Sequence, residues 1–312
     1  MSVVRVSQLR KTFQVVQTSS GFLPSVKSLF RREYKEVKAV DTISFELEEG
    51  ELVGFIGPNG AGKTTTLKCL SGVLHPTSGV VTVLNNVPFE RKQEFLKKIA
   101  LVAGQKNQLL WDLPAKETFK LNKEIYEIPN KNYKETLNEL VKLFEIEDIL
   151  DTQVRKLSLG QRMKCELIAS LLHSPQIIFL DEPTIGLDVV MQKNIRDFLK
   201  EYNHKYQATI LLTSHYMEDV KELCRRVIII DKGKILFDGE LSEIVEKYAP
   251  FKIIEVVFGK NLPNPVLLLS ANRVTPWQGP SEGRLPATAD EAVSLLGSFS
   301  YSSSSKYSHR KK

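Results

Sequence analysis

The stretch GPNGAGKTTT, Gly57 to Thr66, decides the fold of this chain. It follows an apolar run at residues 52–56 and satisfies the spacing G-x-x-x-x-G-K-[ST]. A strand that enters a glycine-rich turn and continues as a helix directs several backbone N–H groups and a positive helix end towards one anion. The pattern therefore predicts a phosphate-binding loop, with these residues in contact with the phosphates: Gly57, Pro58, Asn59, Gly60, Ala61, Gly62, Lys63, Thr64 and Thr65.

Two loop residues and two acids farther along the chain are predicted to carry the chemistry. Lys63 is placed to reach the β- and γ-phosphates, and Thr64 offers a hydroxyl to Mg²⁺. The run QIIFLDE, residues 176–182, predicts a buried strand that ends in Asp181 and Glu182. Asp181 is expected to orient Mg²⁺, and Glu182 to polarise the water that attacks the γ-phosphate. The alternative interpretation is a plain acidic turn, and the upstream phosphate loop favours the catalytic one.

Composition and charge limit the classes of protein that remain. The chain has 312 residues, 42% of them hydrophobic and 26% charged, and no apolar run approaches the roughly 20 residues that span a bilayer. The start of the chain lacks the apolar region of a secretory signal, which predicts cytoplasmic residence. The net charge of +6 is carried by residues 22–38 and 261–312, so the main body is neutral and no nucleic-acid partner is expected. Three widely separated cysteines suggest neither a zinc site nor disulfides.

The order of patterns predicts several segments. Alternating apolar residues at 3–13 and 39–48 predict strands of a small sheet, separated by an insert at 14–38. Residues 22–38 have the spacing of a basic amphipathic helix, which either packs on the sheet edge or contacts lipid headgroups or a membrane partner. Residues 90–157 are predicted to form a helical subdomain, and three apolar runs from 176 to 239 predict strands of a mostly parallel sheet.

The end of the chain changes in composition. Residues 246–269 include the strand-like KIIEVVF and are predicted to start a C-terminal extension. Residues 270–312 are rich in Ser, Pro and Gly and are predicted to be a disordered tail without a catalytic part. The main nucleotide-binding domain is accordingly assigned to residues 1–245.

Four further motifs stand at characteristic places around the loop and the acids. LSLGQ contains Ser158, Gly160 and Gln161, VAGQKNQ contains Gln105, TIGLD contains Asp188, and LLTSH contains His215. With these motifs in this order, the sequence resembles the ATP-binding subunits of ABC transporters over about residues 3–245. Leu159 departs from the family signature, which has glycine at that place.

The resemblance implies a fold, a mechanism and roles for these residues. The fold is an α/β P-loop NTPase core with a mostly parallel sheet, a small antiparallel β subdomain and a helical signature subdomain. In the family two cassettes enclose ATP, and Ser158, Gly160 and Gln161 of one copy bind the γ-phosphate held by the other. Asp188 acts across this dimer, Gln105 senses Mg²⁺ and the attacking water, and His215 holds the γ-phosphate and that water together.

An aromatic side chain is expected to stack on the adenine, because stacking tolerates differences in detail and excludes water from the ring. Phe13 stands at the family's place for this residue, before the insert, and Tyr34, towards the end of the insert, is its rival. Packing of either ring within the core or against the insert is the alternative interpretation.

The resemblance narrows to bacterial export-type systems in which a polytopic permease is a separate chain. It implies a Mg²⁺-dependent ATPase that works as a dimer, most simply a homodimer, on the inner face of the cell membrane. Two other classes stay open: a soluble ABC ATPase that acts without a permease, and a nucleotide-binding module without catalysis. Lys63, Asp181, Glu182 and His215 together argue against the last of these.

Overall fold

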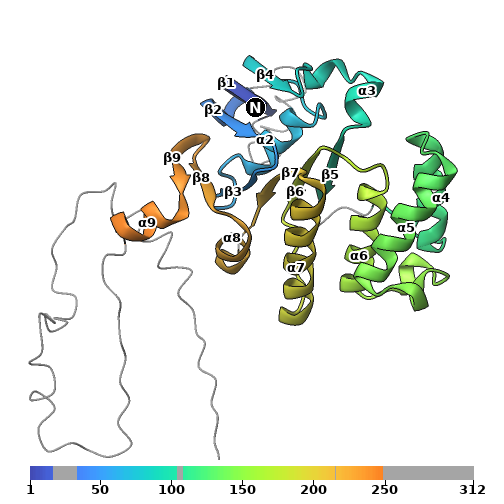
Figure 1. Ribbon diagram of the computed structural model, residues 1–312. Helices are drawn as coiled ribbons and strands as arrows, with labels where there is room; N and C mark the ends of the chain where they lie inside the picture. Colours follow the sequence, from blue (N-terminus) through green and yellow to red (C-terminus); the bar gives the residue numbers. More distant parts are fainter. Residues whose placement is uncertain (17–33, 104–107, 215, 249–312) are drawn as a thin grey trace, which may run out of the picture. The chain divides into compact units, whose positions relative to one another are not determined.

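The computed structural model describes residues 1–16, 34–103, 108–214 and 216–248 (Figure 1). The chain divides into two units, Met1–Leu241 and Ser242–Lys312. The predicted end of the nucleotide-binding domain, residue 245, lies within helix α9, Leu241–Tyr248. Residues 249–269 of the extension predicted at 246–269, the whole tail predicted at 270–312 and most of the predicted insert helix lie outside the described residues.

A six-stranded sheet forms the core of the first unit, with the strand order β5-β6-β7-β3-β8-β9. Five neighbouring strands are parallel, and β9 pairs with β8 in the antiparallel direction. The bounds are β3 Leu52–Ile56, β5 Ile99–Ala103, β6 Ile177–Asp181, β7 Thr209–Thr213, β8 Arg226–Asp231 and β9 Lys234–Glu240. Strands β6, β7 and β3 are parallel and lie side by side, with β7 in the middle. The residues that follow these three strands therefore meet at one edge of the sheet.

The central strands are apolar because both faces of the sheet are covered. All five residues of β7 are buried, as are the first four of β6, which is the pattern expected of parallel strands packed on both sides. The last of the three strands predicted between residues 176 and 239, at residues 226–239, is wrong in one respect. This stretch is a hairpin of β8 and β9, and β9 alternates exposed and half-buried residues as an edge strand does.

The small antiparallel sheet has the order β2-β1-β4, with β1 Ser2–Val16, β2 Tyr34–Glu48 and β4 Ser78–Val83. Strand β1 pairs with β2 as far as Val16 and Tyr34. The predicted insert at 14–38 is therefore too long at both ends, and residues 34–38 form a strand rather than a helix. Phe45 of β2 packs on Phe55 of β3, with ring centroids 5.8 Å apart, so the two sheets share one hydrophobic core.

Helices α4, Ala115–Ile125, α5, Asn130–Phe144, and α6, Leu159–Leu171, pack on one another, as Figure 1 shows in green. Leu140, Val141 and Phe144 are the buried residues of α5. The helical region predicted at 90–157 needs one correction. It also contains β5, which belongs to the core sheet and contacts α6.

The remaining helices connect the strands. Helix α7 contacts α8, and α8 contacts β3. Their bounds are α2 Lys63–Leu70, α3 Gln93–Leu96, α7 Val189–Tyr206 and α8 Met217–Leu223, and short 3₁₀ turns occur at Pro88–Glu90, Glu147–Ile149 and Val154–Lys156.

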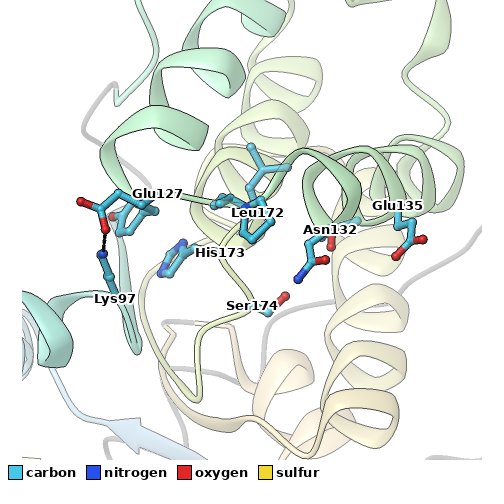
Figure 2. A pocket seen from close by; sticks show the side chains of 11 residues that line it. Lys97, Glu127, Asn132, Glu135, Leu172, His173 and Ser174 are labelled. Atoms are coloured by element: carbon cyan, nitrogen blue, oxygen red, sulfur yellow. Dashed lines mark hydrogen bonds and ion pairs between the residues drawn. The ribbon is translucent and has the colours of Figure 1, made fainter.

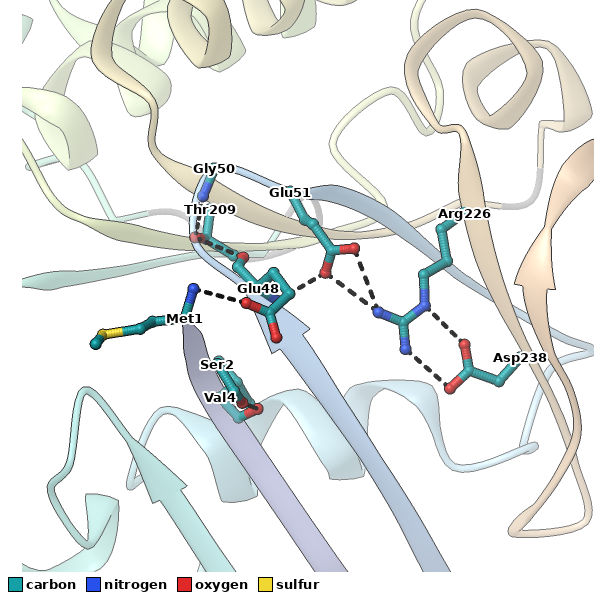
Figure 3. Close-up of polar contacts among 9 residues, drawn as sticks. All are labelled: Met1, Ser2, Val4, Glu48, Gly50, Glu51, Thr209, Arg226 and Asp238. Atoms are coloured by element: carbon teal, nitrogen blue, oxygen red, sulfur yellow. Dashed lines mark hydrogen bonds and ion pairs between the residues drawn. The ribbon is translucent and has the colours of Figure 1, made fainter.

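Polar contacts fix the end of the core sheet that is remote from the phosphate loop (Figure 3). Arg226 makes two hydrogen bonds to Asp238, which joins β8 to β9, and its Nη1 also donates to both carboxylate oxygens of Glu51 just before β3. The Thr209 hydroxyl accepts the N–H of Gly50 at 3.0 Å and thereby joins the start of β7 to the turn before β3. These bonds hold β3, β7 and β8 in register, and this register positions the residues at the opposite edge.

Candidate functional site

The phosphate loop connects β3 to α2, and Lys63 is the first residue of that helix. The Lys63 ammonium is buried and donates hydrogen bonds to the carbonyl oxygens of Gly57 at 2.6 Å and Pro58 at 3.0 Å. Burial lowers the pKa of Lys63, whereas the negative charges of Glu182 and Asp181 act to raise it. The loop thus contains a cation that lies within electrostatic reach of both predicted acids.

Three oxygen-bearing side chains meet beside the loop. Asp181 Oδ1 accepts a hydrogen bond from Thr64 Oγ1 at 3.1 Å and one from Thr213 Oγ1 at 2.8 Å. Mg²⁺ takes oxygen ligands and is commonly held by one or two protein carboxylates together with substrate phosphates and water. Within the described residues, no cluster of three or more His, Cys, Asp or Glu side chains forms a competing metal cage. The hydroxyl of Thr64 and the carboxylate of Asp181 therefore fit a magnesium ion.

Thr213 is not among the residues predicted from the sequence. It is fully buried at the end of β7, and its hydroxyl both donates to Asp181 and accepts the N–H of Glu182 at 3.1 Å. Because β7 lies between β3 and β6, Thr213 occupies the position between the phosphate loop and the two acids. A threonine at the end of an apolar run is a weak signal until this strand order is known.

Glu182 has a strained backbone, with φ of +55°. Its N–H is held by the carbonyl and the hydroxyl oxygens of Thr213, both at 3.1 Å. A left-handed conformation in a residue other than glycine costs of order 1–3 kcal/mol and persists where the surroundings enforce it. Thr213 therefore fixes the direction in which the Glu182 side chain leaves the sheet edge.

Two loop glycines are required by the close approach of neighbouring backbone. A Cβ on Gly57 would lie 2.0 Å from the carbonyl oxygen of Ile230 in β8. A Cβ on Gly62, whose φ is +111°, would lie 2.4 Å from the carbonyl oxygen of Ala39 in β2. The loop is therefore backed on two sides by strands, which predefines the path of its N–H groups.

Gly57→Ala is expected to lower the free energy of unfolding by about 3 kcal/mol, because a backbone carbonyl of a core strand cannot move aside. Gly60→Ala is the matched control in the same loop. A Cβ there has nothing within 4 Å, and only the φ of +79° opposes it, so a loss of about 1 kcal/mol is expected. Urea unfolding of both variants measures the difference. An equal or smaller loss for Gly57→Ala would contradict the close packing against β8.

The predicted signature residues begin α6. Ser158 caps the helix: its hydroxyl accepts the N–H of Gln161 at 3.2 Å, and its own N–H donates to Gln161 Oε1 at 3.0 Å. A Cβ on Gly160 would lie 2.9 Å from Met191 of α7, and one on Gly186 would lie 3.1 Å from Leu159. Asp188 caps α7 by accepting the N–H of Met191. The start of α6 therefore packs on the loop before α7.

The pairing of β1 with β2 shows where the two aromatic residues that could stack on the adenine lie. Phe13 lies opposite Val37, and Tyr34 lies opposite Val16. Because side chains alternate along a strand and directly opposed residues share a face, Phe13 and Tyr34 lie on opposite faces of the ribbon. The Lys11 ammonium lies 5.2 Å from the centroid of the Phe13 ring.

Comparisons with known proteins agree with this geometry. The sequence model of the family described as ABC transporter matches residues 40–185. The ABC transporter ATP-binding protein NatA of Bacillus subtilis (strain 168) is 36% identical over 217 residues, which cover 70% of this chain and 88% of that protein. This chain belongs to the ABC transporter ATP-binding proteins.

Other members of the family match in sequence or in fold. The bacitracin transport ATP-binding protein BcrA of Bacillus licheniformis is 32% identical over 224 residues, which cover 70% of this chain and 72% of that protein. A solved ATP-binding subunit of an ABC transporter superposes with a TM-score of 0.65 at 22% identity, covering 80% of this chain and 94% of its own. The ATP-binding cassette MJ0796, solved as a dimer with ADP and Pi, gives a TM-score of 0.62 at 23% identity, covering 76% and 98%. The predicted P-loop fold class is confirmed.

Two predicted site residues of this ABC protein, Gln105 and His215, lie outside the described residues. Their neighbours are described. Gln108 donates its side-chain amide to the carbonyl of Leu101 in β5, and Ser214 and Tyr216 stand on either side of position 215. The roles of Gln105 and His215 stay predictions.

A cavity of about 400 Å³ lies apart from the phosphate loop of this ABC protein (Figure 2). Lys97 and Glu127 form an ion pair at one side of it, and Asn132 and Glu135 lie across from them. His173 stacks on Tyr126, donates from Nε2 to the carbonyl of Ile99 at 3.0 Å, and has its pKa lowered by burial. His173 joins the end of α6 to β5, and none of the cavity residues belongs to the predicted site.

Proposed function

We propose that this ABC protein binds and hydrolyses MgATP and uses the reaction to drive transport through a separate membrane permease. The observation that carries the proposal is the meeting of Lys63, Thr64, Asp181 and Glu182 at one edge of the core sheet. A buried cation, a hydroxyl next to a carboxylate, and a constrained glutamate are the parts that phosphoryl transfer to water requires. The family membership supports the same reaction.

Each residue has a distinct part in this mechanism. Lys63 exchanges its loop carbonyls for the β- and γ-phosphate oxygens of ATP, and the N–H groups of Gly57 and of residues 59–65 surround those phosphates. Thr64 and Asp181 would hold Mg²⁺, with Gln105 as a further predicted ligand. Mg²⁺, when bound, neutralises charge on the phosphate oxygens. Glu182 accepts a proton from the attacking water, and His215 holds that water and the γ-phosphate.

We propose that a second copy of the chain completes the site. The hydroxyl of Ser158 accepts the Gln161 N–H, so its own proton can donate to a γ-phosphate held by the partner, along with the N–H of Gly160. Val189 and Val190 follow Asp188 directly and are 71% and 70% exposed. A partner that covers this edge would bury them, which supports the assignment of Asp188 to the dimer contact.

We propose Phe13 rather than Tyr34 as the residue that stacks on the adenine. Phe13 lies opposite Val37, two residues before Ala39, whose carbonyl closely approaches Gly62 of the phosphate loop. Tyr34 lies farther along the ribbon from this contact and on its other face. The position of Phe13 therefore suits a base attached to a phosphate chain that ends in the loop.

The proposed site of action is the cytoplasmic face of the cell membrane. None of the described helices is long and apolar enough to cross a bilayer. Attachment would come from a polytopic permease, and export is the direction implied by the subgroup that the sequence resembles. The name of the relative BcrA, a bacitracin transport protein, is in keeping with a transport role.

Fractionation tests the permease proposal against the alternative of a soluble ABC ATPase. The full chain is expressed with and without a candidate permease, a polytopic membrane protein taken from the same organism. We expect the chain to sediment with membranes only when that protein is present, and to be recovered with it in detergent. A chain that stays in the supernatant in both cases, or that sediments with ribosomes, would overturn the transport proposal.

A further inference from the structure

A fully buried carboxylate, Asp219 in α8, is bonded to three other segments of the chain. Its Oδ2 accepts hydrogen bonds from Thr184 Oγ1 at 2.5 Å and from Ser214 Oγ at 2.7 Å. Its Oδ1 accepts a hydrogen bond from Arg196 Nη1 of α7 at 2.9 Å. Arg196 is also buried and supplies the compensating positive charge. Both oxygens are thus satisfied, as a buried carboxylate requires.

Two of these partners belong to the segments that carry predicted catalytic residues. Thr184 stands two residues after Glu182, and its side chain is almost fully buried. Ser214 follows Thr213 at the end of β7, and its hydroxyl also accepts the N–H of Tyr216 at 2.9 Å. One carboxylate therefore ties the segment after β6 to the backbone on both sides of position 215.

We propose that Asp219 is a positioning residue for ATP hydrolysis, acting through the hydroxyls of Thr184 and Ser214. It keeps the segment that carries Glu182 and the segment at the end of β7 in a fixed relation to each other. This inference rests on the proposed ATPase function and adds residues that do not touch the reacting groups. A carboxylate suits this position because both of its oxygens accept hydrogen bonds, so all three donors are bonded at once. An amide has only one accepting oxygen, and its N–H groups would face either Arg196 or the two hydroxyls.

The hydroxyl of Thr184 offers a test that changes very little of the packing. Thr184→Val keeps the shape of the side chain but removes the hydrogen bond to Asp219, and Thr184→Ser keeps the hydroxyl. We expect the valine variant of the full chain to lose about 10- to 100-fold in kcat, since small misplacements of catalytic groups have effects of this size. We expect its KM for ATP to change less than about threefold, and the serine variant to retain most of the kcat.

A double variant tests whether the two hydroxyls act through one group. Thr184→Val and Ser214→Ala, combined, are expected to reduce kcat by clearly less than the product of the two single effects, because both substitutions release the same carboxylate. Independent, multiplicative effects would argue against Asp219 as the common link.

Thr209→Val is the matched control. Thr209 lies at the opposite end of β7 from Ser214, is equally buried, and uses its hydroxyl in a hydrogen bond with Gly50 (Figure 3). We expect this variant to lose thermal stability with unchanged kcat per folded molecule. If Thr184→Val behaves in the same way, or if Thr184→Ser is as slow as Thr184→Val, the positioning role is overturned. A wild-type chain that does not hydrolyse ATP would instead refute the proposed function.

Discussion

Glu182→Gln is expected to reduce ATP turnover by about 1,000-fold while leaving ATP bound between two paired cassettes. Glutamine has nearly the shape of glutamate, and it keeps the backbone N–H that bonds to the carbonyl and hydroxyl oxygens of Thr213. The amide cannot accept a proton from water, and loss of a general base typically costs 10²- to 10⁴-fold. We propose that hydrolysis is the step that reopens the pair, so the ATP-bound dimer should accumulate.

Phosphate release and light scattering after gel filtration with Mg²⁺ and ATP measure the two parts of this prediction. Glu145→Gln is the matched control. Glu145 also has a positive φ, +52°, but it is exposed at the end of α5. This control should turn over ATP at the wild-type rate. A wild-type rate in Glu182→Gln itself would remove Glu182 from the role of base, and a monomer under these conditions would contradict the proposed pairing.

The sequence was sufficient to predict the parts of the site that are local in the chain. The strand, turn and helix around Lys63 follow from one continuous run of residues, and Asp181 and Glu182 follow from an apolar strand that ends in acids. Thr213 and Asp219 could not be predicted in this way. Their roles depend on the position of β7 between β3 and β6 and on the packing of α8, which are tertiary facts.

The errors in the predicted elements also have physical causes. Residues 99–103, IALVA, are too few for periodicity to distinguish a buried strand from part of a helix. Residues 34–38 are exposed on both faces of the ribbon, so no hydrophobic alternation marks them as a strand. In both places long-range pairing, with β6 and with β1, decides the structure.

Lys63→Ala is expected to raise the Kd for MgATP by at least about 100-fold. The ammonium is the buried cation of the loop, and it now makes two hydrogen bonds, to the carbonyls of Gly57 and Pro58. When these bonds are transferred to phosphate oxygens they become charge-assisted at both ends, and hydrogen bonds that involve a charged group contribute about 1.5–3 kcal/mol each. Two such bonds correspond to a loss of two or more orders of magnitude in affinity.

The same lysine also braces the loop, so the measurement must separate loss of the cation from collapse of the site. Titration with MgATP and with adenosine separates the two effects. Adenosine lacks the phosphates, so its binding depends on the aromatic contact proposed for Phe13 and not on the cation. Lys68→Ala, in the same helix, is the matched control and should bind both ligands as the wild type does. An undiminished affinity of Lys63→Ala for MgATP would refute the assigned loop. An equal loss for adenosine would mean that the lysine acts by shaping the loop rather than by binding phosphate.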